Sequence, residues 1–156
     1  MNETKIEKEF RKYKSQYIRV LGNHALSNDE LDDVCKSLFG VKYRGTYPVD
    51  SKFQMKPGMF IINTDIASGD GVHWQGLILS KTVAYIYDSF GRDPDKTIPI
   101  LTKRLRRAKY KITSSDRKDA EQRATYKNRI VVNCGRSCIS WLLCAHKFGI
   151  RAAMKI

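Results

Sequence analysis

The chain has 156 residues, a length that predicts a single domain with its own hydrophobic core. Its composition, 42% hydrophobic and 29% charged residues, is typical of a soluble globular protein, and no run of 18 or more apolar residues predicts a membrane span. The N-terminal residues lack the apolar core of a signal peptide, so we expect synthesis in the cytosol. Three of the four cysteines fall in one predicted helix, which favours reduced thiols over disulfides.

The formal net charge of +13 is unevenly distributed along the chain. Between Lys96 and Arg129, twelve basic residues stand against three acidic ones, a net charge of +9. Such a block predicts a polyanionic partner, with nucleic acid as the preferred candidate and a merely solvated basic face as the alternative. Since no sequence-reading motif is present, binding to DNA would be non-specific and strongly salt-dependent.

Two helices are predicted at the N-terminal end of the chain. Residues 4–21 place apolar side chains at helical spacing among charged ones, so they predict an amphipathic helix. Ser27 and Glu30 form the pattern of a capping box, in which each side chain bonds the backbone of the other residue. The second helix begins there and ends at Gly40.

The middle of the chain predicts three strands. Turn-forming residues at 45–48 and 56–58 indicate a loop before them. The strands are expected at residues 59–63, 72–79 and 83–88. Because only Ser80–Thr82 connect the second strand to the third, these two strands are expected to pair as a hairpin.

After the hairpin, the pattern alternates between short elements and polar sequence. Residues 89–91 predict a turn, and residues 98–108 a short basic helix with a proline in its first turn. A short strand is indicated at 110–113. The polar and charged residues 114–127 indicate a long surface loop.

Cys134 stands where an apolar helical pattern follows the run of residues 130–132. We therefore expect Cys134 at the start of a buried helix that ends at Gly149, where free N–H groups and the helix dipole would favour a thiolate. Gly135 would leave room for a substrate backbone beside the sulfur. The functional interpretation is an activated nucleophile, and the alternative is an ordinary buried cysteine.

Two further residues can join Cys134. His73 opens the first strand of the hairpin and Asp88 ends the second, so antiparallel pairing would bring them together at one end. A carboxylate in that position could hold the imidazole tautomer and stabilise its charged form. The hypothesis is a triad with Cys134 as nucleophile, His73 as general base and Asp88 as its orienting acid.

From about Leu31 to Phe148, the chain resembles the adenovirus maturation proteases, called adenains, and more distantly the proteases that process ubiquitin-like proteins. The segments that carry the resemblance are Gly45-Thr46-Tyr47, Ile62-Asn63-Thr64, Gly71-Val72-His73-Trp74, Tyr87-Asp88-Ser89-Phe90-Gly91 and Cys134-Gly135-Arg136-Ser137-Cys138. The order His, acid, Cys is that of this clan. The resemblance implies an α+β fold, with a small mixed β-sheet flanked by helices and residues 1–22 as an additional N-terminal helix.

The resemblance also implies site residues. His73, Asp88 and Cys134 match the catalytic triad of the family, and the backbone N–H of Cys134 would be one oxyanion-hole donor. The family completes that hole with a glutamine six or seven residues before the cysteine. Here Asn128 offers the same amide group on a shorter side chain, and Gln122 lies further upstream.

The resemblance implies a viral cysteine endopeptidase that cleaves capsid or core precursor proteins during virion maturation, in the host cell nucleus and in the virion. No cofactor is expected, apart from DNA or a peptide as activator, and a monomer is the default. A protease for ubiquitin-like modifiers and a catalytically weak DNA-binding protein on the same fold are the alternatives. A zinc site made from Cys134, Cys138, Cys144 and His146 is disfavoured, because these residues converge poorly along one helix.

Overall fold

The computed structural model describes residues 4–22, 24–69, 73–115 and 130–156, and these residues form an α+β fold around a five-stranded mixed sheet. The strands follow one another across the sheet in chain order: β1 (Tyr43–Pro48), β2 (Gly58–Asn63), β3 (Trp74–Leu79), β4 (Val83–Tyr87) and β5 (Lys111–Ser114). The outer pairs β1–β2 and β4–β5 are parallel, whereas β2–β3 and β3–β4 are antiparallel. The predicted α+β class, the small mixed sheet and the β3–β4 hairpin are confirmed.

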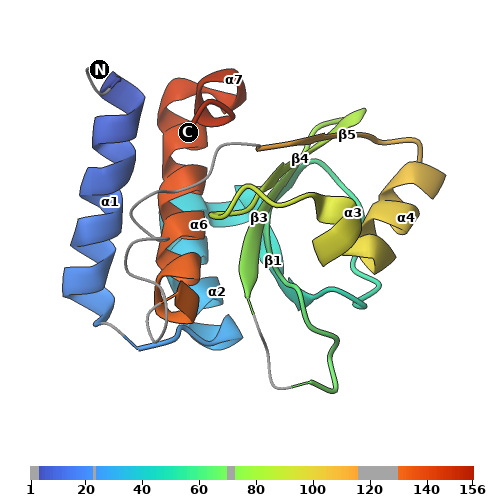
Figure 1. The fold of residues 1–156 in the computed structure, drawn as a ribbon, viewed down its shortest axis with the longest axis horizontal. Helices are drawn as coiled ribbons and strands as arrows, with labels where there is room; N and C mark the ends of the chain where they lie inside the picture. The colour runs from blue at the N-terminus through green and yellow to red at the C-terminus, as the bar shows by residue number, and fades with distance from the viewer. Residues whose placement is uncertain (1–3, 23, 70–72, 116–129) are drawn as a thin grey trace.

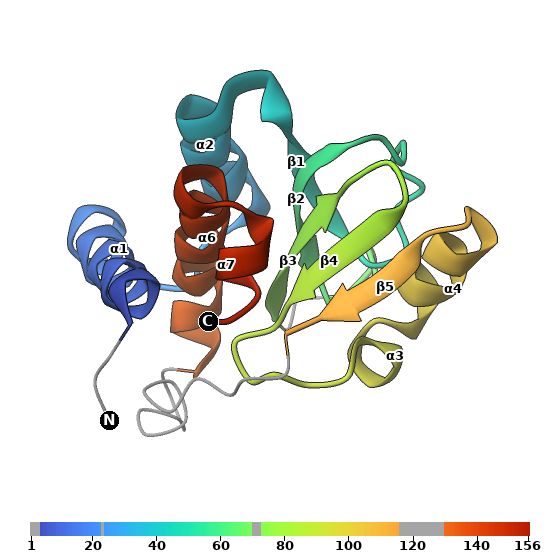
Figure 2. The same cartoon turned by 90° about the horizontal axis from the view of Figure 1, so that it is seen from above.

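Helices cover both faces of the sheet (Figure 1). On one face lie α1 (Lys5–Leu21), α2 (Asn28–Phe39), α6 (Ile130–Phe148) and α7 (Ile150–Ala153). The other face carries α3 (Pro94–Thr97) and α4 (Pro99–Arg107). Figure 2 shows that α6 lies directly against the sheet and that α1 packs on the outer side of α6. None of the described helices is long and apolar enough to cross a membrane.

Local sequence signals explain the helix ends. The capping box is confirmed, because the Ser27 Oγ accepts the Glu30 N–H at 3.2 Å while Glu30 accepts the Ser27 N–H at 3.1 Å. Gly149, with φ of +93°, ends α6 as expected. The predicted helix at 98–108 is confirmed as α4, and the four-residue helices α3 and α7 were not predicted.

The loop predicted at residues 45–48 is wrong, because these residues belong to the edge strand β1. Their turn-like composition has two structural causes. Gly45 has φ of +142° next to an irregularity in the β1–β2 register, and a side chain there would collide with the Tyr47 ring. Pro48 ends the strand, a position in which a missing N–H costs no ladder hydrogen bond.

The two faces of the sheet bury separate hydrophobic clusters. The α6 face is centred on Trp141, whose ring stacks on Tyr87 with centroids 5.3 Å apart. Gly76 of β3 allows this close packing, since a Cβ on it would lie 2.8 Å from the Trp141 ring. The α4 face buries Leu101 and Leu105 against β2, β3 and β4. Packing on both faces fixes the strand ends that carry the candidate site.

Candidate active site

The β3–β4 hairpin brings His73 and Asp88 together. Gly76 pairs with Tyr87, and continuing this register places Asp88 opposite Gln75. His73 lies two residues before Gln75, on the same face, and is therefore the diagonal neighbour of Asp88. The His73 Nε2 and Asp88 Oδ1 atoms are 2.7 Å apart, and both side chains are at least 95% buried. The predicted contact between these two residues is confirmed.

The surroundings keep both members of this pair charged. Burial lowers the pKa of His73, but hydrogen bonds and charges from Asp88 and Cys134 outweigh it and raise the pKa from 6.5 to about 9. Burial raises the pKa of Asp88, yet hydrogen bonds from His73 and Arg92, together with the imidazolium charge, hold it well below its usual range. The pair is therefore an imidazolium and a carboxylate near neutral pH.

Cys134 reaches this pair from α6, on the other side of the hairpin end. Its side chain is fully buried, and the backbone N–H of Trp74 points to its Sγ at 3.4 Å. The contribution of Cys134 to the raised pKa of His73 places the thiol beside the imidazole. Because Nε2 faces Asp88, Nδ1 is the ring nitrogen that can exchange a proton with Cys134.

The predicted position of Cys134 at the start of its helix is wrong. The helix already includes Ile130, the first described residue after the gap, so Cys134 lies beyond its first turn. A backbone N–H at that position bonds a carbonyl of the same helix. The effect of the helix dipole is confined to the first turn and is therefore weak at Cys134. The β-branched run 130–132 has a modest intrinsic helix propensity, which the rest of this buried helix overrides.

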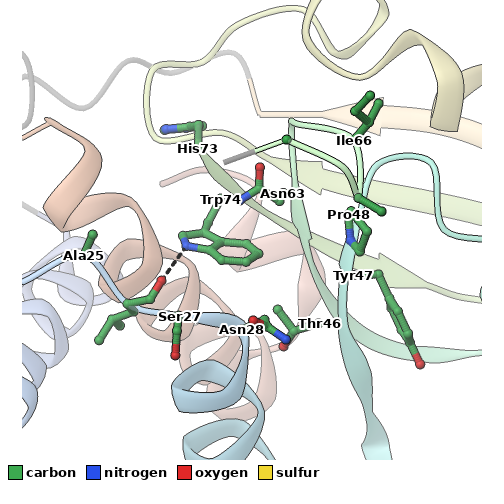
Figure 3. Close-up of a pocket in the computed structure, with 13 residues that line it drawn as sticks. Ala25, Ser27, Asn28, Thr46, Tyr47, Pro48, Asn63, Ile66, His73 and Trp74 are labelled. Carbon is green, nitrogen blue, oxygen red and sulfur yellow. Dashed lines mark hydrogen bonds between the residues drawn. The ribbon is translucent and has the colours of Figure 1, made fainter. Parts of the chain in front are cut away.

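The sequence predicts that Gly135 leaves room beside the sulfur, but in the structure this room is filled. A Cβ on Gly135 would lie 3.3 Å from the Leu26 side chain and 3.5 Å from the Trp74 indole. The indole Nε1 donates to the Leu26 carbonyl at 3.0 Å (Figure 3). Gly135 thus allows the α1–α2 connection and Trp74 to pack over the start of α6.

A pocket of about 410 Å³ opens beside His73 and Trp74 (Figure 3). Residues 25–28 form one wall, and the end of β1 at 46–48 forms the opposite wall. Asn63 and the loop after β2 complete the lining. The pocket is large enough for a few residues of an extended chain, and it ends at the candidate base.

The other predicted site residues are placed as follows. Asn128 and Gln122 lie outside the described residues. The remaining cysteines are buried packing residues: burial raises the pKa of Cys35 and of Cys144 to about 12, and that of Cys138 well above 9. No group of potential metal ligands occurs in the described part of the chain. Cys134 is thus the candidate for a reactive thiol among the four cysteines.

Sequence reasoning missed Arg92, which donates to both carboxylate oxygens of Asp88. The spacing of four residues between them was the available signal. That spacing indicates a contact on a helix, but the two residues flank a turn. The contact therefore depends on how the turn folds.

Comparison with models of known protein families and with curated proteins gives no match for this chain. The resemblance to the adenovirus maturation proteases therefore stays a prediction.

The raised pKa of His73 predicts a pH-dependent stability. Folded protein binds this proton more tightly than unfolded chain, so the stabilisation is complete below about pH 6.5 and is lost as the pH rises to about 9. Asp88, whose pKa is lowered, is ionised in both states over this window. With Cys134→Ser in every protein compared, so that a folded-state thiolate does not offset the imidazolium, the free energy of unfolding should fall between pH 6 and 9 by about 1–2 kcal/mol more with His73 in place than in His73→Gln, measured by urea denaturation.

The control for this measurement is His24→Gln, which alters an exposed imidazole that contacts Glu30. This variant should keep the pH dependence of its Cys134→Ser parent. An equal fall in that parent and in His73→Gln would show that His73 is not a charged partner of Asp88.

Proposed function

We propose that this protein is a cysteine endopeptidase in which Cys134, His73 and Asp88 act as nucleophile, base and orienting acid. The observation that carries the proposal is the 2.7 Å hydrogen bond between buried His73 and Asp88 at the point where Cys134 approaches the imidazole. A buried imidazolium and carboxylate are costly unless they are well paired. Because the pair lies beside a thiol and a pocket, it could take part in a reaction of that thiol with a bound substrate.

The reaction follows from the proton positions. The Cys134 thiolate attacks the carbonyl carbon of the scissile bond, and the imidazolium of His73 gives its Nδ1 proton to the departing amine. The resulting thioester is hydrolysed by water, from which His73 takes a proton; the C–S bond then breaks, the acid product leaves, and the thiolate and imidazolium are restored. Asp88 keeps the Nε2–H of the ring directed to its carboxylate throughout. Asn128 remains our candidate for the side-chain oxyanion donor.

The pocket beside His73 is the candidate binding cleft for the substrate. The resemblance noted above suggests a substrate with small residues such as glycine near the cut, and the lining residues Ala25, Ala67 and Gly69 leave room for an extended chain. The same resemblance suggests capsid or core precursor proteins, cleaved during virion maturation in the host nucleus and the virion. A protease for ubiquitin-like modifiers would use the same cleft, and it is our second candidate.

Basic residues of α4 and β5 support a further proposal, that the protein binds DNA without sequence preference. In the described part of the +9 block, Arg104 donates to the Ser51 carbonyl and Arg106 pairs with Asp95, so these two are engaged internally. The exposed basic residues there are Lys96, Lys103, Arg107, Lys109 and Lys111. These side chains are free to approach phosphates.

The role of Asp88 in catalysis is tested by Asp88→Asn, which keeps the shape of the side chain but not its charge. Cleavage of a proteome-derived peptide library, read by mass spectrometry, should fall by about 10²-fold or more, because the imidazolium loses its carboxylate. Asp95→Asn is the matched control. Asp95 also pairs with an arginine, at 2.6 Å, but on the surface and away from the site, so cleavage should be unchanged.

Equal activity of Asp88→Asn and wild type would contradict the triad. Cleavage of a modifier that ends in Gly-Gly, without cleavage of the library, would favour the second candidate. DNA binding without any cleavage would favour the catalytically weak DNA-binding protein.

DNA binding is tested by the triple variant Lys103→Gln, Arg107→Gln, Lys109→Gln. If these residues contact phosphates, its affinity for a duplex should fall, and the slope of log K against log salt should decrease by about 2–3 in fluorescence anisotropy. The matched control removes the same charge from the exposed face of α1, at Lys5, Lys8 and Lys12. An equal loss in both triple variants would show that net charge, and not this surface, is responsible.

A further inference from the structure

Asp88 is held on two sides. Its Oδ1 accepts from His73 Nε2 at 2.7 Å and from the Arg92 guanidinium at 3.2 Å. Its Oδ2 accepts from both the Nε and the backbone N–H of Arg92, each at 2.9 Å. Three of the four hydrogen bonds to this carboxylate therefore come from Arg92, and rotation of the carboxylate would break them together.

The turn between the two residues makes this contact. The Gly91 N–H donates to the Asp88 carbonyl at 2.8 Å, and Gly91 has φ of +65°, which brings the chain back over Asp88. The Phe90 ring then lies between the two partners of the carboxylate. Its centroid is 5.6 Å from that of His73, and the Arg92 guanidinium carbon lies 5.1 Å from it.

Among the residues that the structure describes, the other elements packed around Asp88 supply no second charge of this kind. From the segment after β5, Ser115 Oγ accepts the Asp88 backbone N–H at 3.2 Å. From α6, the thiols of Cys134 and Cys138 are near enough to act on the His73–Asp88 pair. Arg92 is thus the permanent positive charge among these neighbours.

We propose that Arg92 is a positioning residue that locks the Asp88 carboxylate against His73, with Phe90 as the spacer that holds the imidazole plane. The catalytic meaning of this role rests on the proposed peptidase function. The alternative is an ordinary surface ion pair, which contributes little. The burial of Asp88 argues against it, since its side chain is 2% exposed, whereas that of Arg92 is 44% exposed. The partly exposed Arg92 guanidinium therefore places its positive charge next to a buried carboxylate.

The test is an NMR titration of the full-length protein, following the Asp88 carboxyl carbon and the ring nitrogens of His73. In Arg92→Gln, the Asp88 midpoint should rise into the measurable range, and neutral His73 should change from a single Nε2–H tautomer to a mixture. Arg92→Lys keeps the charge without the planar fork, so it should restore the Asp88 midpoint but not the single tautomer. Arg106→Gln, the matched control, should move Asp95 alone.

Unchanged Asp88 and His73 signals in Arg92→Gln would overturn the proposal, and so would a shift of Asp88 that leaves the His73 tautomer intact. Peptide cleavage in the same variants separates this result from the peptidase proposal. A positioning role predicts that Arg92→Gln lowers kcat about tenfold with KM unchanged, the scale of one lost charge-assisted hydrogen bond. An inactive wild type would refute the peptidase proposal, while the titration would still decide the role of Arg92.

Discussion

The buried hydrogen bond between His73 and Asp88 is the interaction on which the rest of the site depends. Two opposite charges lose much of their hydration in such a place, and good geometry is needed to compensate for that loss. The hairpin register supplies the geometry by making the two residues diagonal neighbours. The turn at residues 89–91 adds Arg92, which donates twice to Oδ2, the carboxylate oxygen that His73 does not reach. The charged imidazole lies beside the Cys134 thiol, which α6 presents from beyond its first turn.

Packing on the α6 face holds the Cys134 thiol against this pair. Trp141 of the same helix fits over Gly76 and stacks on Tyr87, the residue that precedes Asp88. The Phe10 ring of α1 meets Tyr87 edge-on, with centroids 6.1 Å apart. The N-terminal helix thus reaches the strand that carries the acid, and the relative position of α6 and β4 depends on a continuous set of aromatic contacts. A shift in any of them would move the thiol relative to the imidazole.

Those parts of the fold that depend on local signals could be predicted from the sequence. The Ser27–Glu30 capping box and the short β3–β4 connection each act within a few residues, and the connection alone brings His73 to Asp88. Strand β1 was missed because its glycine and proline indicate a turn, whereas its parallel pairing with β2 is a non-local contact. The helical state of residues 130–132 was missed because packing of the rest of α6 overrides their propensity. The contact of Arg92 depends on the path of a turn, which composition does not specify.

The most direct test of a working thiolate–imidazole pair is the rate of alkylation of Cys134 against pH, read by peptide mass spectrometry. The account predicts fast reaction below pH 7 that is lost in His73→Ala, because the imidazolium is what stabilises the thiolate. Cys35, Cys138 and Cys144 are buried like Cys134 but have raised pKa values, so they should react slowly in the same samples and serve as internal controls. Reaction of Cys134 only near the ordinary thiol pKa of about 8.5, unchanged by His73→Ala, would contradict the account.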